Sequence, residues 1–350
     1  MTIGLYGLPT AGKTYIMDRI DFMDVYSGSR FLREIAPGFD TGDEEYRNNA
    51  RKKLARELLQ KDDFIMDGHY QFGKKKVFTE ADGMLYDAVI YLYIKPDILR
   101  ERMALSEKNR KYLVHDIERW QRDEIAGLRA YCHENLKDFY VIDNPPVFDS
   151  EDTRRIIRFI KDIMKGYSCV SFARDCAKSI LAAAGSNRII LTDGDKTLIR
   201  EDSSNVFLGY RTHTFDGNFY TGYQAWKQKA EMQSLSKPHL DASAVTMNEK
   251  VISRFDAPAF ILSSGDTTIW GHLADSFGYT VYAGDRMTAE TKAFIARLLQ
   301  QAGKYVIVYG DSMSDYFMLR QADEGYLVTR DDGSISRSLN GTELEDIRYV

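Results

Sequence analysis

The feature that most constrains the fold is a glycine-rich loop near the start of the chain, residues 7–14, which reads G-x-x-x-x-G-K-T. It follows the apolar residues 3–6 and precedes a segment that we expect to be helical, so the sequence predicts a buried strand, a tight loop and a helix in succession. The two glycines let the main chain curl until successive N–H groups point inward. At the N-terminus of a helix, such a curl favours phosphate binding.

Short apolar segments recur along the chain and alternate with longer amphipathic ones. Val, Ile, Tyr and Phe dominate the strand candidates, which are residues 3–6, 64–66, 89–94, 139–142, 189–191, 260–262 and 305–309. Buried strands separated by helices predict parallel sheets built from crossover units. A chain of 350 residues is long enough for two domains. We therefore expect an α/β protein with two three-layer α/β/α domains.

The predicted domain boundary lies near residue 167. The sequence Asn144-Pro145-Pro146 ends one strand, and a helix is expected from Ser150 to about Lys165, where Gly166 ends it. A second helix over 171–184 is expected to end at Gly185. These signals divide the chain into domains 1–166 and 167–350.

Composition excludes several classes of protein. The chain has 47 Lys and Arg against 52 Asp and Glu, a net charge of -5, whereas proteins that bind nucleic acid through their whole-molecule field are usually basic. Three scattered cysteines form neither a disulfide framework nor a zinc site, which favours a reducing, cytoplasmic location. No apolar run approaches the roughly 18 residues of a membrane span.

The residue types of the first loop predict an ATP and Mg²⁺ site. Gly7 and Gly12 shape the loop, Lys13 can reach the β- and γ-phosphates, and the Thr14 hydroxyl can ligate Mg²⁺. Asp67 ends another apolar strand, where a carboxylate on the Mg²⁺ side is expected. An aspartate that merely ends a strand in a turn is the alternative interpretation of Asp67.

Residues 25–33 resemble the acceptor-binding segment of adenylate kinases and their relatives. The resemblance implies that Ser27, Ser29 and Arg33 hold the acceptor, with the arginine on its phosphate. Serine replaces the usual Thr-Gly-Asp pattern, so the acceptor stays open. The alternative interpretation of this segment is the solvent-exposed start of a helix.

Residues 95–129 resemble the lid of nucleoside monophosphate kinases, which brings arginines onto the transferring phosphate. Arg102, Arg119 and Arg122 are the first candidates, ahead of Arg100 and Arg110. A charged, solvent-exposed helix face explains many of these arginines equally well, so we expect one or two of the five to be functional. The glutamates of that face would be Glu101, Glu107, Glu118 and Glu124. Residues 1–166 as a whole resemble P-loop kinases of the adenylate kinase and polynucleotide kinase group.

A second site follows the apolar residues 189–191, where the chain reads D-x-D-x-T from Asp193 to Thr197. Two carboxylates at the carboxyl end of a strand can converge on one substrate. Asp193 is the predicted nucleophile and would carry a covalent aspartyl-phosphate. Asp195 would protonate the leaving group and then activate the hydrolytic water.

Adjacent acids and a phosphate require positive charge, and later segments supply candidates for it. Ser264 follows a strand and can donate to the phosphate, and Lys292 can neutralise it. Asp311 follows another strand and would complete a Mg²⁺ site with Asp193 and Asp195, with Asp315 in support.

These four motifs, in this order over residues 188–330, resemble the haloacid dehalogenase superfamily and most of all its phosphoserine phosphatase-like branch. The resemblance implies a Rossmann-like domain in which residues 200–256 form a helical cap that excludes water and selects the leaving group. The cap contains an aromatic stretch over residues 215–226. Its aromatic residues are expected to form cap core more than to stack on a ligand, namely Phe207, Tyr210, Tyr220, Tyr223 and Trp226.

Together the motifs predict a bifunctional Mg²⁺-dependent kinase and phosphatase that acts on nucleotides or small phosphorylated metabolites. The domain order resembles phage-type polynucleotide kinase 3′-phosphatases, so end repair of nucleic acids is the first alternative. The acidic balance and the long cap favour the small molecule. A regulatory protein whose loop senses ATP without transferring phosphate is the second alternative.

Overall fold

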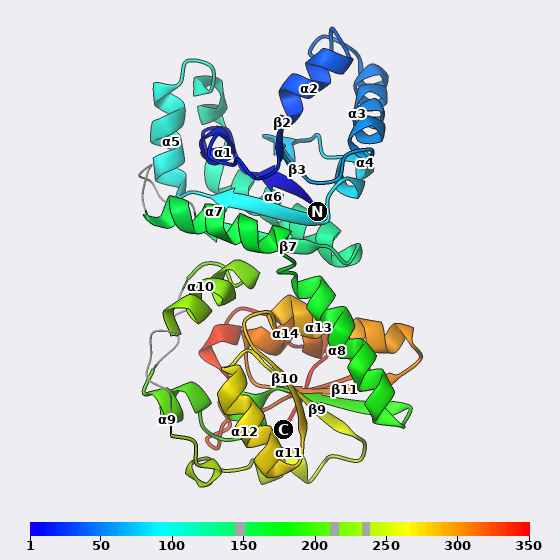
Figure 1. Cartoon of the computed structure of the whole chain (residues 1–350). Coiled ribbons are helices and arrows are strands. Elements are labelled where there is room, and N and C mark those ends of the chain that lie inside the picture. Colours follow the sequence, from blue (N-terminus) through cyan, green and yellow to red (C-terminus); the bar gives the residue numbers. More distant parts are fainter. Residues whose placement is uncertain (144–150, 211–216, 233–238) are drawn as a thin grey trace. The chain divides into compact units, whose positions relative to one another are not determined.

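The computed structural model describes residues 1–143, 151–210, 217–232 and 239–350. These residues form two units, Met1–Tyr167 and Ser168–Val350 (Figure 1). The predicted strand end at Asn144-Pro145-Pro146 and the helix start at Ser150 lie outside the described residues.

The first unit is built on a five-stranded parallel sheet. Its strand order is β2-β3-β1-β6-β7. The strands are β1 (Thr2–Tyr6), β2 (Asp24–Ser27), β3 (Phe64–Asp67), β6 (Ala88–Tyr93) and β7 (Asp138–Asp143). A separate antiparallel pair joins β4 (Gln71–Phe72) to β5 (Lys75–Lys76). The helical elements are α1 (Lys13–Met17), α2 (Gly28–Ile35), α3 (Glu44–Leu58), α4 (Glu80–Met84), α5 (Pro96–Leu105), η1 (Arg110–Val114), α6 (Ile117–Glu134) and α7 (Glu151–Met164).

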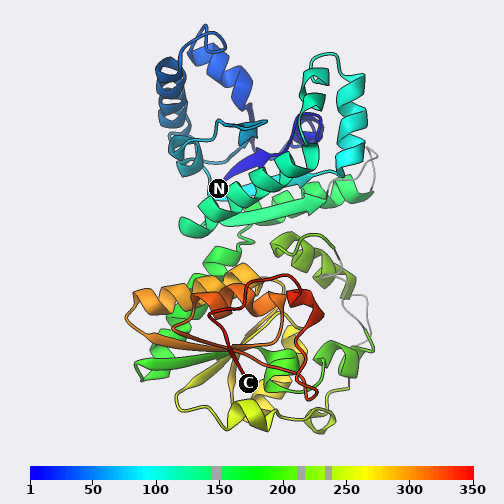
Figure 2. The ribbon, with the colours of Figure 1, turned by 180° about the vertical axis from the view of Figure 1, so that it is seen from behind.

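Helices cover both faces of this sheet. Tyr91 and Val141 are register partners on β6 and β7, and the Tyr91 hydroxyl donates to Glu124 of α6. The adjacent residue Tyr140 points to the opposite face, where its ring meets Phe159 of α7 edge-on at 5.0 Å. The two long helices therefore lie on opposite faces, α7 in front in Figure 1 and α6 in front in Figure 2. This is a three-layer α/β/α arrangement.

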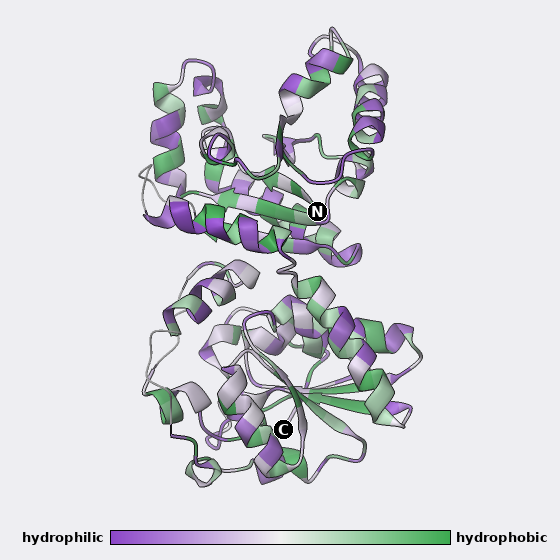
Figure 3. Cartoon of the chain, viewed as in Figure 1, coloured by the Kyte–Doolittle hydropathy of each residue, from purple (hydrophilic) through white to green (hydrophobic). Residues whose placement is uncertain are grey.

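The second unit contains a six-stranded parallel sheet. The strand order is β10-β9-β8-β11-β12-β13. From β8 the chain builds the sheet first on one side, with β9 and β10, and then on the other side, beginning with β11. Ligands bind at such a switch point, outside the carboxyl ends of the strands. The strands are β8 (Arg188–Thr192), β9 (Ala259–Ser263), β10 (Thr280–Ala283), β11 (Tyr305–Gly310), β12 (Glu324–Leu327) and β13 (Arg348–Tyr349). The apolar strands stand out against amphipathic helices in Figure 3.

Helices also cover both faces of the second sheet. Ile261 of β9 packs on Trp270 of α12, and Ile190 of β8 packs on Val251 of α11. On the other face lie α8, α13 and α14 (Figure 1). The helical elements are α8 (Cys169–Ala184), α9 (Ser203–Leu208), α10 (Gly222–Met232), η3 (Ala242–Ala244), α11 (Glu249–Ile252), α12 (Thr267–Phe277), α13 (Ala289–Gln301), α14 (Met313–Gln321) and η4 (Arg337–Leu339).

The fold class predicted from the sequence is confirmed, with two parallel α/β sheets covered by helices. Each strand candidate overlaps a strand of the structure, and only the candidate over residues 89–94 extends beyond its strand, by Ile94. The helix before the proposed boundary is α7, and the one after it is α8, which ends at Gly185 with φ +56°. Elements α9, α10, η3 and α11 lie within residues 200–256, the segment expected to form a cap. No helix in the described part of the chain is long and apolar enough to span a membrane.

Candidate functional sites

The glycine-rich loop joins β1 to α1 and is strongly curled. Gly7, Thr10 and Gly12 have φ values of +146°, +68° and +90°. A Cβ on Gly7 would lie 2.8 Å from the carbonyl oxygen of Leu92, so glycine is required there for close packing of the main chain as well as for its conformation. The loop therefore leaves β1 at the carboxyl edge of the sheet, between β3 and β6.

Lys13 is buried at the centre of this loop. Its Nζ donates to the carbonyl oxygens of Gly7 at 2.6 Å and Leu8 at 3.3 Å. Burial lowers the pKa of Lys13 to about 8, while the charges of Asp67 and Glu124 act in the opposite direction. The lysine thus has two carboxylates as counter-charges and only main-chain acceptors in direct contact.

Asp67 ends β3 next to the loop, since its register partner is Leu5 of β1. One of its oxygens, Oδ1, accepts from the Gly28 main-chain N–H at 2.8 Å. The neighbouring Thr14 is exposed on α1. The structure thus places Asp67 close enough to Lys13 to act as its counter-charge, and it leaves Thr14 exposed.

Glu124 contradicts the interpretation of α6 as a uniformly solvated charged helix. It is fully buried, and Oε1 accepts from the Gln71 main-chain N–H at 3.0 Å and from Trp120 Nε1 at 3.3 Å. The Tyr91 hydroxyl donates to Oε2 at 3.0 Å. Burial raises the pKa of Glu124 to about 7, although these donors and Lys13 oppose the rise. By contrast, Glu101, Glu107 and Glu118 are exposed as expected.

The lid and acceptor candidates separate into two groups. Arg102 is partly buried, and its Nη1 donates to the Thr10 carbonyl oxygen of the loop at 3.3 Å. Arg119 is exposed and pairs with Asp123 on its own helix at 3.7 Å. Exposed residues also include the other lid and acceptor candidates Arg100, Arg110, Arg122, Ser29 and Arg33, whereas Ser27 is partly buried. Arg102 is thus the lid candidate that the structure places at the loop.

Arg33 does not reach the loop. Its Nε pairs with Asp40 at 2.7 Å, and both side chains are more than half exposed. This hydrogen bond raises the pKa of Arg33 and lowers that of Asp40. The acceptor arginine inferred from the resemblance is therefore held by a carboxylate of its own unit.

In the second unit, three strand ends bring acids and hydroxyls together. Asp193 follows β8, Ser263 ends β9 and Asp311 follows β11, and these strands are neighbours in the order β9-β8-β11. Lys292 comes from α13 and Asp315 from the first turn of α14. The sequence motifs thus converge at the switch point of the sheet.

Lys292 is the centre of this site. Its Nζ donates to Asp193 Oδ1 at 2.5 Å and to Asp315 Oδ1 at 2.7 Å, and the lysine and Asp315 have no exposed side-chain surface. Burial alone would lower the pKa of Lys292, but the two carboxylates raise it above its ordinary value. Burial and the charge of Asp315 raise the pKa of Asp193, which Lys292 partly offsets.

The acids could hold a divalent cation. Carboxylate oxygens of Asp193, Asp311 and Asp315 lie within 4.8 Å of one another. Asp315 Oδ2 also accepts from the main-chain N–H groups of Asp311 at 3.3 Å and Ser312 at 3.2 Å. Burial and Asp315 raise the pKa of Asp311 to about 7. Asp195 was also a predicted ligand, and it is not a member of this group.

Asp195 is held by the start of α9. Its Oδ1 accepts from the Ser203 main-chain N–H at 2.6 Å, at the start of α9. Burial raises the pKa of Asp195 to about 6, and the bond to Ser203 opposes the rise. A buried carboxyl with such a pKa suits a group that gives and takes a proton near neutral pH.

The site opens into a cavity of about 550 Å³ within the second unit. Asp193, Asp195 and Asp311 line it, as does Ser264, whose Oγ donates to the Met287 carbonyl oxygen at 2.9 Å. Tyr220 and α10 contribute a mixed wall, in which the α10 residues are Ala225, Gln228, Lys229 and Met232. The cavity also contains residues that the sequence had not singled out, among them Lys196, Asp202 and Arg330.

Of the five cap aromatics, Tyr220 lines the cavity. Burial raises the pKa of Tyr220 to about 12, and a hydrogen bond with Ser264 opposes the rise. Tyr223 is buried and stacks on Trp226 at 6.1 Å. Phe207 instead packs on the core around Trp270 of α12, which lies outside residues 200–256, so it does not belong to a separate cap core. Phe215, the start of the aromatic stretch, lies outside the described residues.

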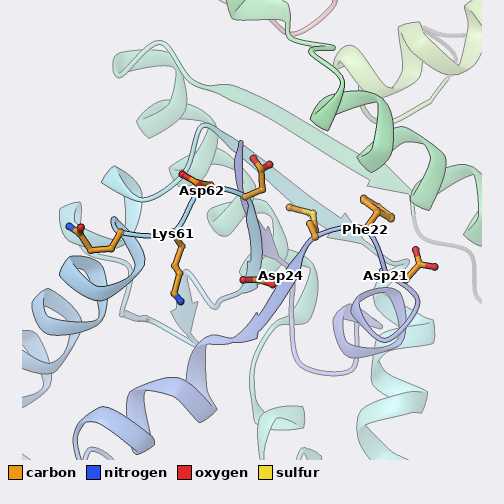
Figure 4. A pocket seen from close by; sticks show the side chains of 8 residues that line it. Asp21, Phe22, Asp24, Lys61 and Asp62 are labelled. Carbon is orange, nitrogen blue, oxygen red and sulfur yellow. The ribbon is translucent and has the colours of Figure 1, made fainter.

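A second cavity, of about 540 Å³, lies in the first unit (Figure 4). Residues 21–24 and 60–63 line it, which places it before β2 and β3. The glycine-rich loop instead follows the carboxyl end of β1. Because these strands are parallel, the cavity lies at the amino ends of the strands and the glycine-rich loop lies at their carboxyl ends.

Comparison with known proteins gives distant matches. No family model matches the sequence, and no curated protein shows a significant match. Among solved structures, a shikimate kinase from Acinetobacter baumannii in complex with shikimate has a TM-score of 0.35 and 16% identity, and the match covers 48% of this chain and 95% of that one. A haloacid dehalogenase (HAD) family hydrolase from Salmonella enterica serovar Typhi has a TM-score of 0.30 and 17% identity, over 51% of this chain and 76% of that one. A shikimate kinase from Bacteroides thetaiotaomicron matches 47% of this chain and 98% of its own, at a TM-score of 0.32 and 14% identity. The activities in these names belong to those proteins.

Proposed function

We propose that this chain is a bifunctional enzyme, with an ATP-dependent kinase in residues 1–166 and a phosphomonoester phosphatase in residues 167–350. The observation that carries the proposal is the buried Lys292, which joins Asp193 to Asp315 at the end of a cavity that also contains Asp195 and Asp311. A buried lysine between two carboxylates, with further acids alongside, is costly to maintain for stability alone.

The phosphatase reaction follows from these positions. A carboxylate oxygen of Asp193 attacks phosphorus, and the bond from phosphorus to the leaving-group oxygen breaks while Asp195 gives that oxygen its proton. Asp195 then takes a proton from a water molecule that attacks the aspartyl-phosphate, which releases inorganic phosphate and restores Asp193. Lys292 and the Ser264 hydroxyl would hold the phosphoryl oxygens.

The acid group fits Mg²⁺, because carboxylate oxygens are the ligands that this cation prefers. Asp193 and Asp311 would hold it, with Asp315 in support. When bound, the ion would offset the negative charge of the acids and the substrate. In the kinase, Thr14 and Asp67 are the proposed residues on the Mg²⁺ side, and Lys13 would bind the phosphates of ATP.

We further propose nucleotides or small phosphorylated metabolites as substrates. A cavity of about 550 Å³ is within the range of small-molecule sites. Repair of polynucleotide ends, with 5′-kinase and 3′-phosphatase steps, is the alternative that the domain order favours. A regulatory role, in which the loop senses ATP without transferring phosphate, is the second alternative.

A substrate panel tests this proposal. The full chain is incubated with γ-labelled ATP and with nucleosides, nucleotides, sugars and 5′-hydroxyl oligonucleotides, and separately with phosphate esters and 3′-phosphorylated oligonucleotides. We expect transfer to a small acceptor and hydrolysis of a small ester. Tight ATP binding without transfer to any acceptor would replace the kinase by the sensor, and a preference for oligonucleotides would select end repair.

A further inference from the structure

Lys196 has a main-chain conformation that lysine rarely adopts. Its φ and ψ are +60° and +6°, in the left-handed region, directly after Asp195. Within the described residues, the other non-glycine positions with positive φ are Thr10 and Leu136. Glycine would adopt this conformation without strain. Strained residues of this kind cluster at functional sites, where the side chain is needed.

The Lys196 side chain lines the phosphatase cavity. Its Nζ donates to Asp202 Oδ2 at 2.9 Å, and the two side chains are 48% and 36% exposed. Burial alone would lower the pKa of Lys196, but the hydrogen bond to Asp202 and the charges of Asp202, Asp311 and Asp195 raise it. The lysine is therefore a cation. An ion pair this exposed contributes little, so another anion can take the place of Asp202 at small cost.

The position of Lys196 is on the leaving-group side of the site. Asp195, the proposed proton donor, must lie next to the leaving-group oxygen. Lys196 is its chain neighbour, and Asp202 and Ser203 fix the start of α9 to the same place. Lys229 also lines the cavity, but it pairs with Asp285, whose side chain is only 11% exposed. Lys196 is thus better placed than Lys229 to meet the leaving group.

We propose that Lys196 is a specificity-determining residue that binds an anionic group on the leaving group. The preferred substrates are then phosphomonoesters whose alcohol carries a second negative charge, a carboxylate or another phosphate. In the structure Asp202 holds the ammonium group, and the substrate anion would replace it. This inference rests on the proposed phosphatase function.

A matched pair of ligands tests the inference in the full chain with Mg²⁺. Hydrolysis of p-nitrophenyl phosphate is followed, and glycerol 2-phosphate and 2-phosphoglycerate are added as competitors that differ by a carboxylate. We expect the carboxylate to lower the inhibition constant about tenfold, the effect of one charge-assisted contact. In Lys196→Gln the difference should fall below about threefold, and Lys196→Arg should retain it. The control Lys250→Gln, at an exposed lysine paired with Asp331, should behave as wild type.

A glycine variant separates strain from charge. Lys196→Gly should raise the melting temperature of the second unit by about 2–4 °C, because glycine relieves the strain, and should abolish the selectivity. Equal inhibition constants in the wild type, or selectivity retained in both Lys196→Gln and Lys196→Gly, would overturn the inference and leave the phosphatase intact. Absence of any p-nitrophenyl phosphate hydrolysis that depends on Asp193 would instead remove the phosphatase function itself.

Discussion

Replacing Lys292 by methionine is the perturbation whose consequences follow most directly from the structure. Methionine has a similar volume and no charge, so Lys292→Met removes the ammonium group and keeps the packing. It leaves Asp193 and Asp315 buried side by side without the cation that joins them. Removing one partner of a buried ion pair costs about 3–5 kcal/mol.

Protonation limits this cost. Burial and Asp315 already raise the pKa of Asp193, and loss of Lys292 raises it further, so one proton can bind between the two carboxylates. We therefore expect the lower end, about 3 kcal/mol, which lowers the melting temperature of a unit of this size by about 6–12 °C. A carboxyl group such as Asp193, whose pKa is higher in the folded than in the unfolded state, stabilises the fold most at pH values below its unfolded pKa. That contribution to the free energy of unfolding is lost as the pH rises through the folded pKa. The deficit of Lys292→Met should thus be larger at pH 8 than at pH 5.

Scanning calorimetry of the full chain at both pH values provides the assay, with the exposed Lys250→Met as the control. The double variant Lys292→Met, Asp315→Asn removes one of the two stranded carboxylates and should recover part of the loss. The interpretation of this ion pair is refuted if Lys292→Met has the same melting temperature as the wild type at pH 8. It is also refuted if the difference in melting temperature between the two proteins grows as the pH is lowered.

Three further outcomes are expected. Gly7→Ala should abolish ATP binding in a titration, since its Cβ would lie 2.8 Å from the Leu92 carbonyl oxygen. The control Gly271→Ala, at a glycine with open space around it, should bind ATP as the wild type does. ATP binding by both variants would refute the role of the curled loop. Burial raises the pKa of Glu124 to about 7, so the stability of the first unit should fall by up to about 3 kcal/mol as the pH rises from 4.5 to 7. Glu124→Gln should remove this pH dependence. Parallel curves of melting temperature against pH for the wild type and the variant would contradict the prediction. Chelation of divalent cations should stop both ATP-dependent transfer and ester hydrolysis. Added Mg²⁺ should restore both activities and raise the melting temperature of the second unit. Activity that survives chelation would count against the metal site.

The sequence predicted the central strands because they are buried on both faces and therefore read as continuous apolar runs. The strand candidates did not include β12, which lies between β11 and β13 and has two buried residues, nor β2, β10 and β13, which lie at sheet edges. The residues of these edge strands are exposed or half-buried, so they lack the apolar pattern. Edge strands depend on pairing with a neighbour that the local sequence does not reveal.

The candidate sites show the same division. Acids that follow apolar strands were predictable, because parallel strands end at one edge of a sheet. Glu124 was assigned to a solvated face, although it lies three residues after Gln121 and four before Leu128, on the buried stripe of α6. Helical periodicity could have found it. The left-handed conformation of Lys196 could not have been found, because lysine has no intrinsic preference for it.

The central claim is that one chain holds two independent phosphoryl sites, and crossed single variants test it most directly. Consumption of γ-labelled ATP and hydrolysis of p-nitrophenyl phosphate are measured for the wild type, Lys13→Ala and Asp193→Asn. The account predicts that Lys13→Ala loses the first activity and retains the second, and that Asp193→Asn does the reverse. Loss of both activities in either single variant would contradict it.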